Sequence, residues 1–330
     1  MTTWAIVTGG AGFIGSHMVD LLIEQGYQVR VLDNLERGRL GNLEQHRGNP
    51  ACEVHQIDVT QLGSSSELFR DARYVFHFAG IGDIVPSIER PLDYMVANVH
   101  GTLAVLEAAR AAGVEKLVYA GSSSCYGATP PLPTDERAPI NTEYPYALSK
   151  YLGECAVLHW QQVYRLPVNS IRIFNAYGPR VRTTGAYGAV FGVFLAQKLN
   201  GKPLTVVGDG TQRRDFVYVT DVARAFLAAA ESDRCGEVFN LGTGAPQTVN
   251  HLVELIGGEV THVPKRPGEP DTTWAETRKI RELLDWAPRV SFEEGVATML
   301  AGIDQWAGAP VWNAQSIAVA TRSWFELLSR

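Results

Sequence analysis

The sequence predicts an α/β fold that is built on a doubly wound parallel sheet and continues into a second, smaller domain. Two observations lead to this prediction. In the first half of the chain, short runs rich in β-branched residues alternate with stretches of helical periodicity, which is the pattern of repeated βαβ units. The first of these runs is followed directly by four glycines within seven residues, "GGAGFIG", as expected where a strand turns sharply into a helix.

Each expected element has a local reason. Apolar, β-branched runs predict strands, and apolar residues at three- and four-residue spacing predict helices. Strands are expected at residues 4–8, 28–32, 52–58, 74–79, 117–121 and 168–174, and helices at 15–25, 99–112, 144–163 and 189–199. A further strand and helix begin within "DFVYVTDVARAF", and the composition then shifts towards proline and charge in "VPKRPGEPDTTWAE". The first domain is expected to span residues 1–174, with the segment at about 216–241 returning to it, and the second to span 175–330.

The overall composition favours a cytoplasmic protein with a small-molecule ligand. The 330 residues suffice for a sizeable core, and a net charge of -6 with no basic run argues against nucleic acid or a membrane surface as partner. The four cysteines lack a CxxC pair, the histidines lack metal-ligand spacing, and no apolar run approaches the length of a membrane span. We therefore expect a reduced protein with neither a metal site nor a membrane segment.

The glycine-rich turn is a candidate nucleotide site, although it could also be only a tight connection. The glycines that fit the GxGxxG and GxxGxxG spacings are Gly9, Gly10, Gly12 and Gly15. Asp33 ends the next expected strand, where a carboxylate would accept hydrogen bonds from an adenosine ribose diol and repel a 2′-phosphate. NAD is therefore favoured over NADP, and the nearby Arg37 and Arg39 leave NADP open. Asp58 ends another expected strand and fits an adenine contact and a capping role equally.

Tyr146 and Lys150 are four residues apart in "YPYALSK", so on a helix they share one face. Lowering a phenol pKa from about 10 to about 7 requires about 4 kcal/mol, which an ammonium about 4 Å away supplies at an effective dielectric of about 20. Tyr146 could thus act as a base towards a sugar or alcohol hydroxyl while hydride leaves the carbon that bears this hydroxyl. Alternatively, the pair could lie on a solvated face. Ser122 could bond the reacting oxygen or merely end a strand, and Ser123 and Ser124 are polar but are not acids near neutral pH.

A set of motifs resembles one enzyme family. In order, the chain contains "TGGAGFIG", "LDN", "FHFAG", "ANVHGTLAVLEAA", "SSSCYG", "YPYALSK", "RIFNAYGPR", "GDGTQRRDFVYVTDVARA" and "RPGEP". This order is similar to that of the extended short-chain dehydrogenase/reductases, and most of all to nucleotide-sugar epimerases of the UDP-glucose 4-epimerase type. The resemblance covers residues 3–295 and leaves the C-terminal tail unmatched. It implies a Rossmann-type NAD-binding domain at 1–174 and a substrate-binding domain at 175–330.

The resemblance also implies roles for individual residues. Ser122, Tyr146 and Lys150 would be catalytic. The NAD-binding residues would be Gly9, Gly12, Phe13, Ile14, Gly15, Asp33, Asn34, Asp58, Val59, Phe78, Ala79, Gly80, Asn98, Tyr146 and Lys150, with Asn98 as much a structural brace as a catalytic group. The substrate-binding residues would be Ser122, Ser123, Ser124, Tyr146, Asn175, Arg214, Arg266, Glu269 and Thr273. Thr273 would lie beside the sugar C2 substituent and leave room for it, unless Trp274 turns inward.

The activity that the resemblance implies is NAD-dependent inversion of C4 of a UDP-hexose through a 4-keto intermediate. UDP-glucose and UDP-galactose are the expected substrates, with the N-acetylated pair also accommodated. Related dehydratases and decarboxylases have Asp or Glu where this chain has Ser123 and Ser124, which argues against elimination of water. The alternatives are epimerisation at another carbon, ketoreduction of a nucleotide-sugar, and a non-catalytic NAD-binding regulator. Helices near 99–112 and 147–163 resemble the pair that forms a homodimer interface in the family.

Overall fold

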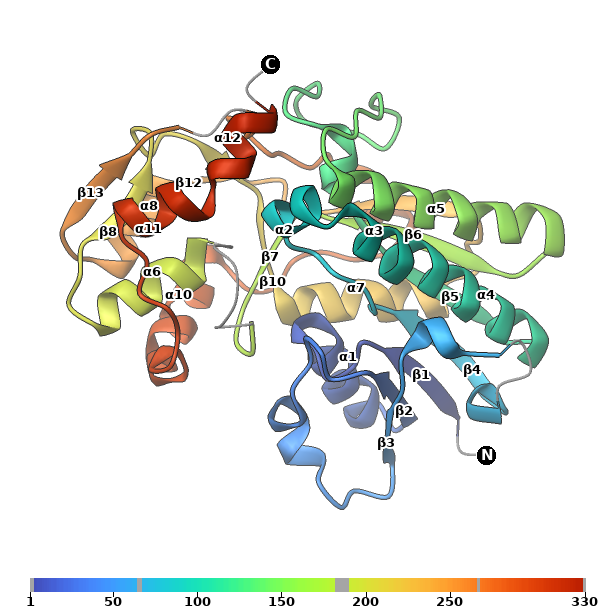
Figure 1. Ribbon diagram of the computed structural model, residues 1–330. Coiled ribbons are helices and arrows are strands. Elements are labelled where there is room, and N and C mark those ends of the chain that lie inside the picture. Colours follow the sequence, from blue (N-terminus) through green and yellow to red (C-terminus); the bar gives the residue numbers. More distant parts are fainter. Residues whose placement is uncertain (1–2, 64–66, 182–189, 266–267, 329–330) are drawn as a thin grey trace.

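The fold is that of a computed structural model, which describes residues 3–63, 67–181, 190–265 and 268–328 (Figure 1). At its centre lies a seven-stranded parallel sheet. From one edge to the other its strands are β11 (Glu237–Leu241), β6 (Val168–Ile173), β5 (Lys116–Ser122), β4 (Ala72–His77), β1 (Trp4–Thr8), β2 (Gln28–Asp33) and β3 (Cys52–Gln56). The strand order reverses between β1 and β4, which is where a doubly wound sheet opens its ligand crevice. The predicted fold class is confirmed.

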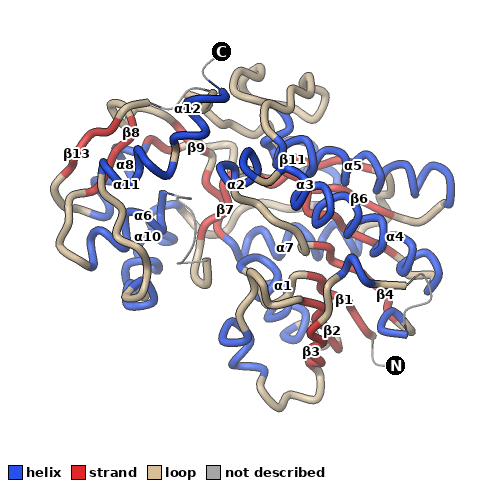
Figure 2. Tube along the Cα trace, viewed as in Figure 1, coloured by secondary structure: helices blue, strands red, loops and turns tan. Residues whose placement is uncertain are grey.

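Helices cover both faces of this sheet. Helices α4 (Gly101–Ala112) and α5 (Pro145–Tyr164) pack together on one face, and α1 (Phe13–Glu24) and α7 (Val219–Glu231) on the other (Figures 1 and 2). Strand β1 shows the consequence: Ala5 and Val7 join the core with α1 and α7, whereas Ile6 joins the core with α4 and α5. A strand that is buried on both faces is apolar at successive positions and does not alternate.

Some element ends differ from those expected, for local reasons. The expected strand at 52–58 ends at Gln56 because Asp58 caps a short 3₁₀ turn, Val59–Gln61, by accepting the Thr60 N–H at 2.9 Å. The expected helix at 99–112 is α4, which continues a π-helical turn at Met95–His100. Further short helices are α2 (Ile84–Glu89) and α3 (Pro91–Tyr94), with 3₁₀ segments at Leu40–His46, Glu67–Phe69, Ser123–Tyr126 and Ile303–Trp306.

A smaller lobe lies beside the sheet (Figure 1). Its strands form three pairs: β7 (Asn175–Tyr177) with β10 (Phe216–Tyr218), β8 (Leu204–Val207) with β13 (Val260–Val263), and β9 (Arg213–Arg214) with β12 (Gln247–Thr248). Its helices are α6 (Val190–Leu199), α8 (Val249–Ile256), α10 (Phe292–Ala301), α11 (Ala314–Ala320) and α12 (Arg322–Leu328). A second core lies within this lobe and includes Phe194 of α6, Leu252 of α8, Val296 of α10 and Trp306.

The chain passes between the two lobes more than once. Within the segment at 216–241, β10 pairs with β7, whereas α7 and β11 belong to the central sheet and its core. Helix α9 (Arg278–Leu284), which lies beyond that segment, packs against β11 and α7 through Ile280 and Leu284. The domain boundary at residue 174 stays a prediction, because the central sheet uses residues on both sides of it.

The described ranges contain neither a helix that could span a membrane nor a cluster of metal-ligating side chains. Among these residues, no helix combines the length and the apolarity needed to cross a bilayer. In the same part of the chain, no group of three or more His, Cys, Asp or Glu side chains is placed to hold a metal ion.

Candidate active site

Two adjoining cavities lie at the carboxyl ends of the central strands. The larger, of about 750 Å³, is lined by residues that follow β1, β2, β4 and β5, and the smaller, of about 430 Å³, lies between α2, the 3₁₀ turn after β5 and the second lobe. Their shared lining residues are Gly82, Asp83, Ser124, Phe174 and Ala176. This is the edge at which open α/β sheets bind ligands.

The glycine turn fits closely against its neighbours. Gly9 has φ +69°, and a Cβ there would lie 2.7 Å from the Ala79 nitrogen. A Cβ on Gly15 would lie 2.2 Å from the Gly9 carbonyl oxygen. Gly12 is the N-cap of α1, and the residues of the first turn, whose N–H groups have no partner within the helix, line the larger cavity. Bare backbone and a positive helix end suit a diphosphate.

Asp33 holds the turn in place from the end of β2. Its carboxylate accepts the N–H of Ala11 at 3.0 Å and that of Leu35 at 2.8 Å, and burial raises the pKa of Asp33 although these bonds oppose the rise. Asn34 donates to Asp58 at 3.2 Å, so both lie beside each other on the cavity wall. A nearby cation, Arg37, is paired with Asp83.

The described lining of the larger cavity contains nearly every residue expected to bind NAD: Gly9, Gly12, Phe13, Ile14, Gly15, Asp33, Asn34, Asp58, Val59, Phe78, Ala79, Gly80, Tyr146 and Lys150. Asn98 is buried behind the wall. It bonds both the N–H (2.8 Å) and the carbonyl (2.9 Å) of Ile81 and also Ser149 (2.9 Å). Asn98 therefore fastens the segment after β4 to α5. Glycine turn, helix end, carboxylate and cavity together fit an NAD molecule.

Tyr146 and Ser122 meet at the wall of the larger cavity. Helix α5 begins with Pro145 at its first position, which places Tyr146 in the first turn. The Tyr146 hydroxyl donates to Ser122 Oγ at 3.3 Å, and the same oxygen accepts the Ser124 N–H at 3.2 Å. Burial raises the pKa of Tyr146, against the opposing effect of the Ser122 bond. The tyrosine–lysine spacing predicts a lowered pKa for Tyr146. The structure gives a raised pKa instead, because burial of the phenol is the largest influence on it.

Lys150 lies one turn further along α5 and is 8% exposed. Its Nζ lies 4.5 Å from the centre of the Tyr119 ring, and the Tyr119 hydroxyl donates to the Lys150 carbonyl at 3.0 Å. Burial lowers the pKa of Lys150 to about 8, although the Glu154 carboxylate opposes this shift. A lysine with this pKa exchanges its proton within the range of neutral to mildly alkaline chemistry.

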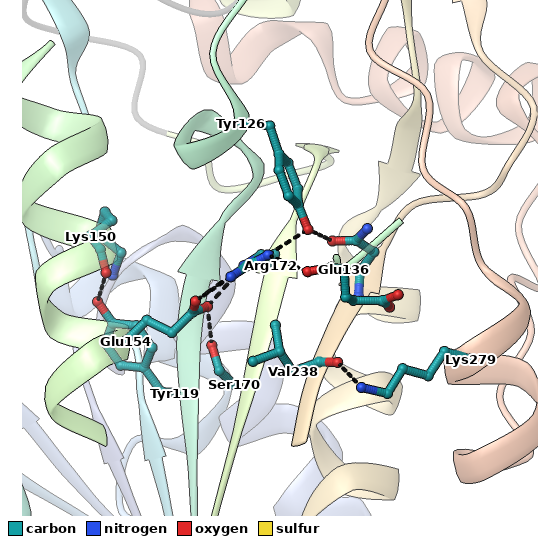
Figure 3. A network of polar contacts seen from close by, with 10 residues as sticks. Tyr119, Tyr126, Glu136, Lys150, Glu154, Ser170, Arg172, Val238 and Lys279 are labelled. Atoms are coloured by element: carbon teal, nitrogen blue, oxygen red, sulfur yellow. Dashed lines mark hydrogen bonds and ion pairs between the residues drawn. The ribbon is translucent and has the colours of Figure 1, made fainter. Parts of the chain in front are cut away.

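A buried polar network supports α5 from behind (Figure 3). Glu154 pairs with Arg172 of β6 at 2.6 Å, and both side chains are almost fully buried. Arg172 also donates to the Tyr126 hydroxyl at 2.7 Å, and Tyr126 donates to Asn240 of β11 at 2.7 Å. The network therefore joins the helix that carries Tyr146 and Lys150 to two strands of the sheet and to the turn after β5.

Most of the expected substrate residues lie around the smaller cavity, whereas Ser122 and Tyr146 line the larger one. Its described lining includes Ser123, Ser124, Asn175, Arg214, Glu269 and Thr273, whereas Arg266 lies outside the described residues. Arg214 and Glu269 pair with each other at 2.9 Å. The Thr273 hydroxyl donates to Asn175 Oδ1 at 2.7 Å and accepts the Asp215 N–H at 3.1 Å.

Trp274 points away from both cavities. Its indole N–H donates to the Gly244 carbonyl at 3.0 Å, and it is absent from the described lining of either cavity. The inward orientation considered from the sequence is therefore not the one that the structure shows.

The sequence analysis missed several lining residues. Asp83 borders both cavities, and Glu143, Tyr144 and Trp324 border the smaller one. The Tyr144 ring stacks on Tyr146, with centroids 6.4 Å apart and an interplanar angle of 9°. Glu143 and Tyr144 directly precede the "YPYALSK" helix, so proximity in sequence could have identified them. Nothing local distinguishes Asp83 or Trp324.

Comparison with known proteins agrees with this geometry. Residues 5–242 match the model of the NAD dependent epimerase/dehydratase family. A putative UDP-glucose 4-epimerase of Methanocaldococcus jannaschii is 38% identical over 299 residues, which cover 88% of this chain and 95% of that protein. A UDP-N-acetyl-alpha-D-glucosaminuronate decarboxylase of Bacillus cytotoxicus is 32% identical over 308 residues, covering 88% and 94%.

Among solved structures, the UDP-glucose 4-epimerase of Thermotoga maritima with UDP-glucose superposes with a TM-score of 0.85 at 34% identity, covering 92% of this chain and 99% of that one. The family match spans the glycine turn, the tyrosine helix and all of the central sheet except Trp4. With the dinucleotide cavity and the Ser–Tyr–Lys set in place, the chain belongs to the NAD dependent epimerase/dehydratase family.

Proposed function

We propose that the protein is an NAD-dependent epimerase that inverts C4 of a UDP-hexose, with UDP-glucose and UDP-galactose as the substrate pair. The observation that carries the proposal is the position of Tyr146. It is bonded to Ser122 on the wall of the cavity that fits NAD, while the adjacent Ser124 borders both cavities. A sugar in the smaller cavity would therefore reach the proton-transfer pair and the cofactor together.

Individual residues would hold NAD as follows. Gly9, Gly12 and Gly15 would bind the diphosphate with the N-terminus of α1, and Asp33 would accept hydrogen bonds from the adenosine ribose. The ion pair between Arg37 and Asp83 engages a cation that could otherwise attract a 2′-phosphate. When bound, NAD would supply the acceptor for the C4 hydride and the donor that returns it to the 4-keto sugar, and its oxidised ring would supply a positive charge.

Tyr146 would take the proton from the C4 hydroxyl and later return it. Ser122 would form a hydrogen bond with the reacting oxygen during this transfer. Its hydroxyl is already bonded to Tyr146, so the two side chains would contact the same substrate oxygen. Lys150, when protonated, would stabilise the tyrosinate electrostatically. The resulting 4-keto sugar would rotate within the cavity, so that hydride returns to the opposite face of C4. The product would therefore differ from the substrate only in the configuration at C4.

The second lobe would bind the rest of the substrate. Arg214 would contact the diphosphate, because a guanidinium matches phosphate geometry, and its present partner Glu269 would accept the uridine ribose hydroxyls. Asn175, which is oriented by Thr273, would contact the sugar or the diphosphate. Arg266 is proposed for the diphosphate from its motif alone.

Dehydration or decarboxylation is the second candidate, and one observation favours it. Ser123 and Ser124 supply no acid, but the carboxyl groups of Asp83 and Glu143 border the smaller cavity. Asp83 is paired with Arg37, whereas Glu143 accepts an Asn141 amide hydrogen at 3.1 Å. Glu143 could therefore act as the acid that an elimination needs.

The test incubates the protein with UDP-glucose and identifies the product by NMR. Epimerisation yields UDP-galactose with no net change in NADH absorbance. Tyr146→Phe should lower kcat by at least about 100-fold, which is typical of a lost general base, while binding of NAD and UDP persists. Tyr164→Phe is the matched control, because Tyr164 is exposed at the far end of α5.

Three outcomes would contradict the proposal. A 4-keto-6-deoxy sugar from a nucleotide-hexose, or a pentose from UDP-glucuronic acid, would support the second candidate. Consumption of external NADPH would indicate ketoreduction. Bound NAD with no turnover of any nucleotide-sugar would indicate a regulator.

A homodimer is part of the proposal. Leu92, Val96, Leu148 and Leu152 are exposed on the packed elements α3, the following π-helical turn and α5. Exposed apolar side chains at helical spacing suit helix packing between two copies.

All four cysteines are free, as in a reducing compartment, and we place the enzyme in the cytoplasm.

A further inference from the structure

The C-terminal tail reaches the smaller cavity. Trp324, on α12, is 5% exposed and is part of the lining of that cavity. This residue lies far beyond residues 5–242, which match the family model, and beyond 3–295, which carry the motif resemblance. Neither the family pattern nor the chemistry described above assigns it a role.

The tail is held in position by its own packing. Trp306 and Ile317 are buried in the core of the second lobe, and the Trp312 carbonyl accepts Gln197 Nε2 at 2.8 Å. Helix α12 then lies beside α2, where Ser323 donates to Glu89 at 3.1 Å (Figures 1 and 2). The packing of the tail therefore holds the Trp324 side chain at the wall of the cavity.

Trp324 lies at the end of the cavity that would hold the sugar. Its ring centre is 6.4 Å from that of Tyr144, which stacks on Tyr146. A substrate hydroxyl must come within hydrogen-bond reach of Tyr146 to lose its proton, so the hexose must lie near these rings. The diphosphate and nucleoside would extend towards Arg214 and Glu269 of the second lobe.

We propose that Trp324 is a substrate-binding residue that covers the hexose of the nucleotide-sugar. One face of a pyranose presents C–H groups, and the indole atoms of Trp324 that border the cavity give these groups a rigid apolar contact. Polar groups such as Ser124 and Asn175 contact the hydroxyls from other sides of the cavity. The inference rests on the proposed function and adds a sugar contact from outside the family motifs.

The test separates binding of the sugar from binding of the nucleotide. Dissociation constants for UDP and UDP-glucose are measured by calorimetry on NAD-loaded protein that carries Tyr146→Phe, so that the sugar is not converted. Trp324→Leu, which keeps apolar bulk but removes the aromatic face, should weaken UDP-glucose about tenfold and leave UDP unchanged. Trp324→Phe should weaken UDP-glucose less than about threefold, because an aromatic face remains.

Leu327→Ala is the matched control, because Leu327 lies on the same helix and is 52% exposed; it should change neither constant. Unaltered UDP-glucose binding in Trp324→Leu would overturn the inference, as would an equal loss of UDP and UDP-glucose. If the protein with native Tyr146 converts UDP-glucose, either result removes only the role of Trp324. If it neither binds nor converts a UDP-sugar, the proposed function falls as well.

Discussion

Replacing Lys150 by methionine should remove activity and change the pH dependence of stability in a defined direction. The ammonium is 8% exposed, and its pKa of about 8 lies below the ordinary value of 10.5. At 1.36 kcal/mol per pKa unit, burying this charge disfavours folding at neutral pH by about 3 kcal/mol. Methionine has a similar apolar stem and no charge, so Lys150→Met lacks this unfavourable contribution.

The sign of the pH effect follows from the two pKa values. Between pH 8 and 10.5 the unfolded chain binds this proton more readily than the folded chain does, so raising the pH stabilises the folded wild type relative to Lys150→Met. The relative gain between about pH 7 and about pH 9.5 is about 2 kcal/mol. It is measured by urea unfolding at both pH values on protein freed of NAD, because bound nucleotide would add its own stabilisation.

Lys202→Met is the control, because Lys202 is exposed; its stability relative to wild type should not change between the two pH values. A constant difference between wild type and Lys150→Met would refute the reasoning, since it would mean that Lys150 carries no buried charge. The same variant should lose at least about 100-fold in kcat, the range expected when proton transfer loses its electrostatic support.

Gly15→Ala should abolish copurification of nucleotide, measured by chromatography after denaturation, because its Cβ would lie 2.2 Å from a backbone oxygen; retained NAD would contradict the assigned cradle. Leu148→Glu combined with Leu152→Glu should give a monomer by light scattering, and an unchanged mass would remove this face from the proposed interface. Thr273→Tyr should lower kcat/KM for UDP-N-acetylglucosamine more than for UDP-glucose, because the larger side chain would exclude the N-acetyl group. An equal loss for both sugars would show that residue 273 acts only by orienting Asn175.

Local spacing explains what the sequence could predict. Gly9, Gly15 and Asp33 belong to one strand–helix–strand unit, so their arrangement follows from the turn and from the ends of two adjacent strands. Tyr146 and Lys150 share a face because they are four residues apart on α5. These are the parts of the candidate site for which neighbours along the chain are also neighbours in space.

Tertiary burial explains what the sequence could not predict. The spacing of Tyr146 and Lys150 shows that they share a helix face but not that burial raises the pKa of one and lowers that of the other. Likewise, Trp324 joins Tyr144 only because the tail crosses the second lobe and returns to α2. The position of α9 against β11 is a similar long-range contact that no local pattern reveals.

The edge strand β11 also has a consequence for biosynthesis. β6 ends at Ile173, and its partner β11 begins at Glu237, after α6, β8 and α7. A ribosome adds residues in order, at about 5–20 per second, so β6 leaves it with one edge unpaired while the intervening chain is still being made. An open parallel edge invites pairing with other chains. The nascent protein must therefore pass through a period of several seconds in which its sheet is incomplete and this edge is open.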